Sequence, residues 1–523
     1  MTRPRRPGPP ESGRRPSPLL AALLSALLPG AGQWYAGKRR RGGWMVGVSV
    51  ALMTPAVVLV LLLFGPWDIS GYGLAVDLVR PFFQHPSLVL ALLAAVVALL
   101  AFRAFAVIDA LLAARDREWH GARVAGVALG LGLILVAVAW PHAWAGEQAL
   151  VLHDFVTTDF TADPGQATTT TTAPTTTTAP VTTTSGTRTT VPGTTTTTTA
   201  PPTTTTTTVP DPWGGAERIT IVLLGGDAGP GRTGIRTDTI IVVSVETATG
   251  RAAMFSIPRN QVRWPVPAGI PAYDTWENHA YPEITNTIYA YGLDHPDLFP
   301  GGPNTGGNAV KAILGEGLGL HIDYFAVVDL LGFVELVDAL GGIDIYVTKP
   351  VNDPNQWWPN GETHDVVIDV GEHHFDGLWA LAYARVRQQD DDYHRMDRQR
   401  CVLEAAVARA DPITLLLQFS ELLPIVQENL RTDIPVARFP DLIELMEKVD
   451  TGSVVSVRFI PYAPELAGTG TSYTLGPDSR GYWSPNLDLI RATVQTVLDS
   501  PPEEALEELD LPSLEEECRP AEG

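Results

Sequence analysis

The chain has 523 residues, more than one small domain requires, and its 36 basic and 58 acidic side chains give a net charge of −22. This acidic balance excludes a nucleic-acid-binding surface, because neutralising phosphates requires Lys and Arg. The charge is segregated: residues 1–156 carry a net +6, residues 157–214 carry −2 and residues 215–523 carry −26. A basic, apolar front and an acidic back indicate a membrane anchor followed by a domain in another compartment.

The first part of the chain is basic and then apolar. Residues 1–17 are rich in Arg and Pro and are expected to be disordered. The apolar run Leu19–Leu28 is too short to cross a bilayer and has positive residues on both sides, so it is expected to lie in the interface or to re-enter. The stretch 25–43 (SALLPGAGQWYAGKRRRGG) resembles a signature of small two-span bacterial membrane modules, and Gly and Pro tightening a membrane turn is the preferred interpretation.

The anchor is predicted over residues 18–145 as about three helical spans, near 44–64, 88–112 and 124–140. The loop between the second and third spans carries three arginines, which favours a cytoplasmic position. An odd number of spans from a cytoplasmic N-terminus then places everything after about residue 141 outside the membrane. Residues 157–214 are a Thr/Pro-rich linker, because 27 Thr among the 41 positions 168–208 cannot bury a core.

The domain predicted over residues 215–500 alternates strands with helices. Strands are expected at 219–224, 239–245, 252–257, 324–330, 343–347 and 454–460. Helices are expected at 285–291, 308–318, 331–340, 377–410, 413–429, 439–448 and 487–498. This order predicts an α/β fold, a three-layer α/β/α sandwich with a mixed central sheet.

Two segments concentrate charge beside predicted buried elements: residues 225–238 (GGDAGPGRTGIRTD) and residues 385–400 (RVRQQDDDYHRMDRQR). Together with Arg259 they hold eight of the domain's 21 bases, and a basic cluster on an acidic protein indicates an anion site. The alternative is a surface of Asp–Arg ion pairs, which contribute little stability. The Gly-rich turn lacks GxxxxGK[ST] and precedes a strand, which argues against a P-loop or a dinucleotide fold.

Residue chemistry favours phosphate as the anion. Asp227 and Asp238 lie at the ends of adjacent predicted strands, where two carboxylates can hold a hard divalent cation such as Mg²⁺. Arginine side chains bind phosphate oxygens bidentately. The two charged segments together therefore predict a site for a metal and a phosphorylated ligand.

Six motifs in order resemble those of the LytR–CpsA–Psr family of cell-envelope phosphotransferases. They are LLGGD (223–227), RTDTIIVVSV (236–245), FSIPRN (255–260), ITNTIYAYG (284–292), YFAVVDLLGFVELVDALGGIDIYV (324–347) and GLWALAYARVRQQDDDYHRMDRQR (377–400). The resemblance covers about residues 216–410 closely. It implies transfer of a glycopolymer from a polyprenyl-(pyro)phosphate carrier to peptidoglycan, outside the membrane, with Mg²⁺ (or Mn²⁺).

The resemblance also implies roles for individual residues. Asp227 and Asp238 would hold the metal. The pyrophosphate would be bound by Arg236, Arg259, Arg385, Arg387, Arg395 and Gln399. Asp392, with Asp390 as second choice, would organise or activate the acceptor, and these two with Arg387 and Arg395 form the predicted catalytic set. Asn260 stands where the family usually has Asp, which puts the charge role of that position in question.

The lipid tail of such a carrier requires an apolar groove. The candidates for lining it are Val327, Leu331, Phe333, Leu336 and Val337, although ordinary core packing is the commoner explanation for each of them. Trp357 and Trp358 either stack on sugar rings or are partly buried in a loop.

The chain has two cysteines, Cys401 and Cys518, neither with a metal-type neighbour. A cysteine pair outside the cell is expected to be bridged. The disulfide would pin the acidic segment 501–523, expected to be a poorly ordered tail, to the domain.

These features predict a multi-pass plasma-membrane protein with an extracytoplasmic catalytic domain that transfers a glycopolymer during cell-wall assembly. The alternative is a non-catalytic binder of polyprenyl-phosphate lipids or wall polymer, which would keep the arginines but would not require the paired aspartates. A transcriptional regulator is excluded by the topology, because the domain lies outside and no basic recognition helix is present.

Overall fold

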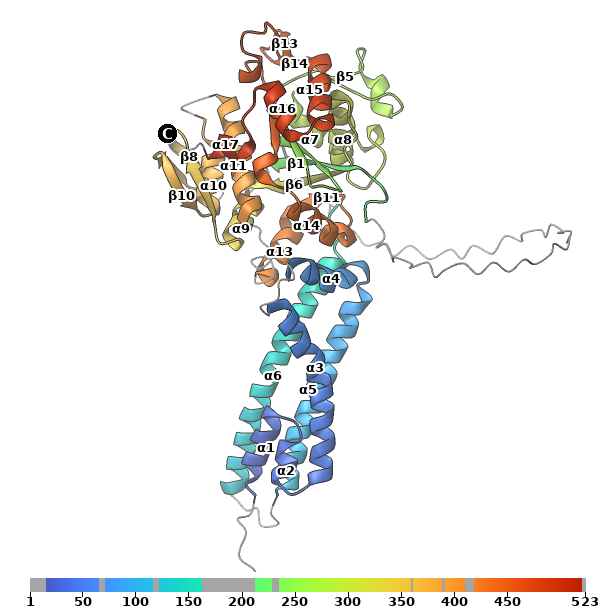
Figure 1. The fold of residues 1–523 in the computed structure, drawn as a ribbon, viewed down its shortest axis with the longest axis vertical. Helices are drawn as coiled ribbons and strands as arrows, with labels where there is room; N and C mark the ends of the chain where they lie inside the picture. Colours follow the sequence, from blue (N-terminus) through green and yellow to red (C-terminus); the bar gives the residue numbers. More distant parts are fainter. Residues whose placement is uncertain are drawn as a thin grey trace, which may run out of the picture.

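The computed structural model describes residues 16–64, 71–115, 122–161, 212–227, 235–358, 361–387, 391–409 and 418–519. A bundle of long helices stands below a compact α/β domain (Figure 1). The bundle consists of α1 (Pro18–Leu27), α2 (Ala31–Tyr35), α3 (Arg39–Phe64), α4 (Gly71–Gln84), α5 (Ser87–Ala113) and α6 (Ala122–Val156).

Two segments of the bundle are long and apolar enough to cross a membrane, α5 and residues 124–156 of α6. They correspond to the second and third predicted spans, and α6 continues to Val156, well beyond the predicted end at 140. The first predicted span lies in α3, which is not one of these two segments. The described residues therefore support membrane anchoring but do not establish a count of three spans.

The Gly-rich motif of residues 29–37 forms a turn that is fastened to α5. Gly30 has a φ of 105°, a left-handed conformation that favours glycine. Gln33 is fully buried, and its amide donates to the Ala106 carbonyl at 2.9 Å and to Asp109 at 3.1 Å. Ser25 donates to the Gln33 amide oxygen at 2.8 Å. The motif thus has a structural explanation, because Gln33 binds the turn after α1 to the neighbouring long helix.

The domain is built on a mixed six-stranded sheet, as the sequence predicts. In order across the sheet its strands are β11 (Leu430–Thr432), β6 (Tyr324–Asp329), β1 (Arg218–Gly226), β2 (Thr237–Glu246), β3 (Ala252–Ser256) and β12 (Val455–Arg458). The β1–β6 and β3–β12 pairs are parallel, and the β1–β2, β2–β3 and β6–β11 pairs are antiparallel. Two-stranded ribbons surround it: β4 (Trp264–Pro265) with β5 (Ala280–Tyr281), β7 (Ile343–Val347) with β10 (Gly371–Phe375), β8 (Val351–Trp357) with β9 (Thr363–Ile368), and β13 (Thr474–Pro477) with β14 (Trp483–Pro485).

Helices cover both faces of the sheet, which gives the three layers. They are α7 (Ile288–Asp294), α8 (Thr305–Leu318), α9 (Leu330–Ala339), α10 (Gly377–Arg385), α11 (Asp392–Arg409), α13 (Phe419–Asn429), α14 (Phe439–Glu447), α15 (Leu487–Asp499), α16 (Pro502–Leu509) and α17 (Leu514–Cys518). Successive strand residues point to opposite faces. Val222 and Val242 belong to the core shared with α8 and α15, and their neighbours Leu223 and Val243 pack in the cluster that includes α17.

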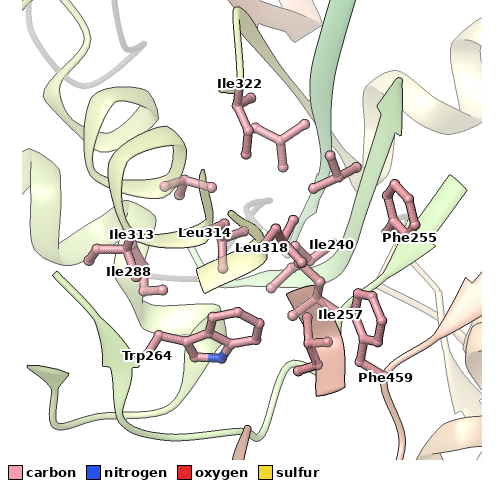
Figure 2. Close-up of a cluster of buried hydrophobic side chains, with 14 of the residues drawn as sticks. Ile240, Phe255, Ile257, Trp264, Ile288, Ile313, Leu314, Leu318, Ile322 and Phe459 are labelled. Atoms are coloured by element: carbon pink, nitrogen blue, oxygen red, sulfur yellow. The ribbon is translucent and has the colours of Figure 1, made fainter. Parts of the chain in front are cut away.

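The larger core lies on the α8 side of the sheet (Figure 2). Trp264 is fully buried there, and its indole nitrogen donates to the Thr285 hydroxyl at 3.1 Å. The rings of Phe255 on β3 and Phe459 after β12 stack with centroids 5.9 Å apart. This packing fixes the carboxyl ends of β3 and β12, where the chain continues into Arg259 and its neighbours.

The single helix predicted over 377–410 is wrong, because the structure has two helices separated by a break. Val386 has an extended backbone with φ −50° and ψ 136°, so α10 ends at Arg385. The Arg387 amide donates to the Asp353 carboxylate at 3.1 Å. The break leaves Arg385 and Arg387 facing the first turn of α11, and a continuous helix would not bring these charges together.

The poorly ordered acidic tail expected over 501–523 is also wrong for its described part, which forms α16 and α17. Leu514 and Cys518 are 2% and 3% exposed, and Cys518 is bonded to Cys401 on α11, which confirms the predicted disulfide. Arg400 is 1% exposed and pairs with Glu517 of α17. A few apolar positions and one disulfide are thus enough to dock a segment whose overall charge resembles that of a solvated tail.

The bundle packs directly against the domain. Phe83 of α4, Phe155 of α6, Phe160 and Phe439 of α14 form one aromatic cluster, with ring centroids 5.3–6.0 Å apart between its packed pairs. Arg80 of α4 pairs with two carboxylates of α14, Asp441 and Glu444.

Both flanks of the Thr-rich segment contact one stretch of the domain, residues 432–438. The Phe160 carbonyl accepts a hydrogen bond from the Thr432 amide at 3.0 Å. Arg438 donates to the Pro212 carbonyl and lies over the Trp213 ring at 5.9 Å. The Thr-rich segment itself, residues 162–211, lies outside the described residues, but it leaves and rejoins the protein at neighbouring points.

Candidate functional site

An apolar cavity of about 330 Å³ lies between the sheet and helices α9, α10 and α11. Its apolar lining comes from both layers and includes Leu223, Leu224, Ile241, Val328, Phe333, Leu336, Leu381, Val402 and Leu403. Two of the five predicted groove residues, Phe333 and Leu336, line this cavity. Val327 and Val337 are instead buried in the cores, and Leu331 is 40% exposed. On α9 the 3.6-residue period places Phe333 and Leu336 on the cavity side and Leu331 and Val337 on other sides. Val327 lies on β6, where its strand neighbours Ala326 and Val328 line the cavity and Val327 points to the opposite face.

Two aspartates predicted to bind metal line the polar end of this cavity. Asp227 follows the last residue of β1 and Asp238 lies at the start of β2, and the two strands are antiparallel neighbours, so both side chains reach the same edge. The Asp227 carboxylate accepts the Arg236 backbone amide at 2.7 Å. Asp238 accepts from the Arg259 guanidinium at 2.7 Å and from the Asn286 amide at 2.8 Å.

Asp238 is held as a carboxylate anion. Burial alone would raise its pKa, but the positive charge of Arg259 and the hydrogen bond from Asn286 outweigh that effect, and the pKa is lowered. For Arg259 burial would lower the pKa, while Asp238 and the neighbouring Asp392 raise it further, so the guanidinium is more firmly protonated than usual. The pair is therefore ionised on both sides.

The Asp392 carboxylate lies among three guanidinium groups. Its Oδ2 accepts from Arg259 Nε at 3.1 Å, and its Oδ1 lies 3.1 Å from Arg395 Nη1. Arg387 Nη2 lies 3.5 Å from the same Oδ1. Arg395 also donates to the backbone carbonyl of Asp238 at 3.2 Å, which ties α11 to β2. One carboxylate thus gathers arginines from three separate segments of the chain.

Arg395 is the most buried member of this cluster, with 3% of its surface exposed. Burial lowers its pKa to about 10, against the opposing effect of Asp392. It therefore remains a cation at neutral pH. A cation so poorly solvated attracts an added anion strongly, because few water molecules screen its charge.

The remaining predicted site residues divide into three groups. Arg385, Arg387 and Gln399 line the cavity, and Gln399 donates to the Ala384 carbonyl at 3.4 Å. Arg236 is not among the described residues of the cavity wall, and its side chain is exposed. Asp390 lies outside the described residues.

Asn286 was missed as a site residue although its motif, ITNTIYAYG, was noticed. It is 4% exposed, and its amide nitrogen holds Asp238. Its amide oxygen is buried and has no hydrogen-bond partner among the described atoms. An amide next to a Thr-rich turn carries no charge signal, and only the fold brings residue 286 beside residue 238.

A divalent cation fits this site only in part. No group of three or more His, Cys, Asp or Glu side chains suitable for a metal occurs in the described part of the chain. Mg²⁺ sites commonly use one or two carboxylates and complete the shell with substrate phosphates and water. Asp227 and Asp238 match that simpler requirement, since both line the cavity beside cationic side chains.

The fold and the site thus define a mixed α/β domain whose apolar cavity ends in carboxylates and arginines. The model of the LytR_cpsA_psr family matches residues 181–479, more than half of the chain. The chain therefore belongs to the LytR–CpsA–Psr family, as the sequence motifs predict.

Curated relatives carry transferase names. The chain is 28% identical over 278 residues to the polyisoprenyl-teichoic acid–peptidoglycan teichoic acid transferase TagV of Bacillus subtilis, covering 51% of this chain and 61% of that protein. It is 30% identical over 231 residues to a protein named TagU, with the same activity, of Oceanobacillus iheyensis, covering 43% of this chain and 62% of the other. The match thus spans about six tenths of the length of these relatives.

Solved structures are similar over the domain. The crystal structure of B. subtilis TagV has a TM-score of 0.40 and 25% identity, and covers 54% of this chain and 98% of that one. The structure titled TagT bound to LIIa-WTA has a TM-score of 0.38 and 22% identity, and covers 54% and 92%.

Proposed function

We propose that this protein transfers a phosphate-linked glycopolymer from a polyprenyl-(pyro)phosphate carrier to a hydroxyl of peptidoglycan. The observation that carries the proposal is the juxtaposition of an apolar cavity with a paired carboxylate–arginine cluster at its end. A lipid phosphate has the same two-part character, an apolar chain attached to a multiply charged head. The transferase names of the curated relatives support the same reaction class.

The cavity accounts for the lipid part. Phe333 and Leu336 of α9 face Leu223 and Ile241 of the sheet across it. At about 25 cal/mol per Å² of apolar surface removed from water, each buried isoprene unit contributes on the order of 2 kcal/mol. Part of the carrier chain lodged in this cavity would place its phosphates beside Arg385, Arg387 and Arg395.

The arginines would stabilise the negative charge that develops during the reaction. The acceptor hydroxyl oxygen would attack the phosphorus that bears the glycan, its proton would pass to a base, and the bond from that phosphorus to the lipid-side oxygen would break so that the lipid phosphate leaves. Negative charge grows on the transferred group and on the leaving oxygen. Arg387, which is half exposed, and the buried Arg395 lie where they can stabilise that charge through bidentate hydrogen bonds.

Asp392 is better placed to position arginines than to take a proton. Both of its oxygens already lie against guanidinium groups of Arg259, Arg387 and Arg395. Its removal would let those cations separate before substrate binds. Asp390, the second choice from the sequence, keeps its predicted role as the group that activates the acceptor.

Mg²⁺ (or Mn²⁺) is part of the proposal. Asp227 and Asp238 would hold it together with the pyrophosphate, and when bound it would supply a positive charge that neutralises the phosphate oxygens. Loss of this ion should lower turnover without unfolding the domain, because neither aspartate depends on a metal for its present hydrogen bonds.

The topology belongs to the same proposal. Three spans, formed by α3, α5 and α6, would leave the domain outside the plasma membrane, on the side of the wall. The basic loops of the sequence favour this orientation. A domain on that side meets both the lipid-linked donor and the peptidoglycan acceptor.

The test is turnover of a polyprenyl-pyrophosphate-linked oligosaccharide by the full chain in detergent or nanodiscs with Mg²⁺. Arg387→Ala and Asp227→Ala should each lose at least 100-fold in rate while the domain stays folded, as a cooperative thermal transition would show. Arg491→Ala is the matched control, because Arg491 is a surface residue of α15 paired with Glu316. Tight lipid binding by the wild-type chain without any transfer or hydrolysis would favour the alternative, a non-catalytic lipid binder.

A further inference from the structure

An aromatic pair lies in the loops that follow the strand end from which Arg259 emerges, and one of its two rings is open to solvent. Tyr462, in the loop after β12, is 77% exposed. Its ring meets that of Trp483 on β14 edge to face, with centroids 6.2 Å apart and an interplanar angle of 76°. An exposed tyrosine held against a half-buried tryptophan leaves aromatic surface open to solvent in a fixed orientation.

The backbone fixes this pair next to the arginine cluster. β3 and β12 are parallel neighbours in register at Ser256 and Arg458, so the residues that follow both strands emerge at one edge of the sheet. Arg259 follows β3 by three residues and Tyr462 follows β12 by four. The Val262 amide donates to the Trp483 carbonyl at 3.0 Å.

These connections limit the distance between the aromatic pair and the arginine cluster. Three residues of extended chain span at most about 11 Å, and the hydrogen bond from Val262 adds 3.0 Å, so the Trp483 carbonyl oxygen lies within about 14 Å of the Arg259 backbone. From the other side, Tyr393 follows Asp392 directly in α11, and its pKa is raised chiefly by burial, with a smaller contribution from Tyr462. The aromatic pair and the charged cluster thus share one edge of the domain.

We propose that Tyr462 and Trp483 form a subsite for a saccharide ring of the acceptor glycan, adjacent to the residues that bind the donor phosphates. This inference rests on the proposed transfer function and names where the second substrate lies. A pyranose ring has a face of C–H groups that packs against an aromatic ring and a rim of hydroxyls that requires polar partners. The aromatic pair supplies the first requirement.

Polar groups in the β13–β14 turn, which leads into Trp483, can supply the second. Arg480, in the turn between β13 and β14, lies over the Tyr482 ring at 5.4 Å and pairs with Glu283 at 3.0 Å. The guanidinium, the carboxylate and the tyrosine hydroxyl can exchange hydrogen bonds with sugar hydroxyls while an aromatic face fixes the ring.

For Trp357 and Trp358 the sequence leaves two interpretations open, stacking on sugar rings or partial burial in a loop, and the side chain of Trp357 lies outside what the structure describes. Trp358 is 8% exposed and packs against His364 and Trp379, with centroids 4.2 and 5.8 Å away, so its face is already covered. Tyr462 has the opposite character. The acceptor would therefore approach across the β12–β14 edge, while the lipid enters from the α9–α11 side.

The experiment measures glycan binding and transfer separately, with the full chain in nanodiscs. Binding of muramidase-released, uncrosslinked glycan fragments is followed by isothermal titration. Tyr462→Ala and the double variant Tyr462→Ala/Trp483→Phe should weaken binding at least tenfold. Tyr462→Phe should retain it, because the ring is kept. Tyr346→Ala, a half-buried tyrosine on β7, is the matched control.

Transfer assays then distinguish this inference from the proposed function. Tyr462→Ala should raise the acceptor KM at least tenfold with a smaller change in kcat, and leave the KM for the lipid-linked donor unchanged. An unaltered acceptor KM and unaltered glycan affinity in folded Tyr462→Ala would overturn the subsite while leaving the transferase proposal intact. Glycan binding that depends on Tyr462 in a chain showing no transfer would overturn the transferase proposal instead.

Discussion

Single charged groups decide whether this site stays assembled without its substrate. Asp392 is the clearest case, because it touches Arg259, Arg387 and Arg395, and Arg395 is almost completely buried. Removing one partner from a buried ionic cluster costs more than the cluster contributes as a whole, since the remaining charge stays desolvated.

Asp392→Asn should therefore destabilise the domain by about 3 kcal/mol. The change would appear as a lower midpoint in thermal or chemical unfolding of the detergent-solubilised chain. Asp297→Asn, a substitution of an exposed carboxylate, should leave the midpoint unaltered. Equal midpoints for both variants would show that Arg395 finds another partner and that Asp392 does not organise the cluster.

The lowered pKa of Asp238 leads to a separate prediction about how stability depends on pH. Its folded-state pKa is lowered, so its ionised form stabilises the fold fully above its ordinary value of 3.8. That contribution is lost as the pH falls from 3.8 through the lowered folded pKa. Asp238→Asn should flatten the decline of melting temperature in this acidic window and should be less stable than the wild type at neutral pH. A variant whose acid limb matches that of the wild type would contradict this role.

The charge pattern predicts which segments come together, but it does not assign the role of each residue. Asp227, Asp238, Arg259 and Arg395 belong to charged segments at predicted strand and helix ends, and the structure brings them close to one another, while their roles stay predictions. Asn286 was not predicted as a site residue, because a neutral amide gives no such signal. The exposed position of Arg236 was equally unpredictable, because the charge pattern does not indicate which way a side chain directly before β2 points.

At the scale of elements, the membrane helices contact the domain through an aromatic cluster, and the contribution of this cluster to the contact can be measured. Phe155 is 2% exposed at the end of α6 and contacts three other aromatic rings. Removing a buried phenyl ring from such a cluster costs about 3 kcal/mol or more.

Phe155→Ala should loosen this contact without unfolding the domain. Hydrogen–deuterium exchange should rise in α13 and α14 and stay unchanged in α8 and α15. Leu150→Ala is the control on the same helix, because Leu150 is 54% exposed. If α14 kept full protection in Phe155→Ala, the aromatic cluster would not be what holds the two parts together.

The elements themselves were predictable where their pattern was simple. β1, β2, β3 and β6 are short apolar runs between turn signals, and α8 and α15 show helical spacing. The ribbons β8–β9 and β13–β14 were missed because they are polar and irregular. The break between α10 and α11 was missed because a run of Gln, Asp and Arg has no period, and because the Arg387 amide beyond the helix end donates to a carboxylate distant in the sequence, Asp353.

At the scale of the whole molecule, the Thr-rich segment separates two parts of the sequence but not two parts of the structure. Residues on both its flanks, Phe160 and Pro212, contact the stretch 432–438. Composition alone predicts a flexible spacer for such a sequence. That composition does not reveal the contacts that the two ends of the segment make with the domain.

Deleting residues 168–208 should consequently leave the melting temperature within about 1 °C and the exchange protection of α14 unchanged. Nine residues would remain between 161 and 212, with a reach of about 30 Å, which suffices to reconnect the two flanks. A scrambled segment of equal length and composition serves as the control. Loss of α14 protection in the deletion alone would show that the segment is needed for docking.

The length of α6 determines how far the domain lies from the membrane. Its 35 residues span about 52 Å, against about 30 Å for the hydrocarbon core of a bilayer. Its last turns pack against α13, which packs against α9, the wall of the cavity. On the proposed topology the reaction would therefore take place at one set height, roughly 20 Å beyond the hydrocarbon. New polymer would be attached only to the innermost, most recently made layer of the wall, and would reach outer layers by being displaced outward as the wall grows.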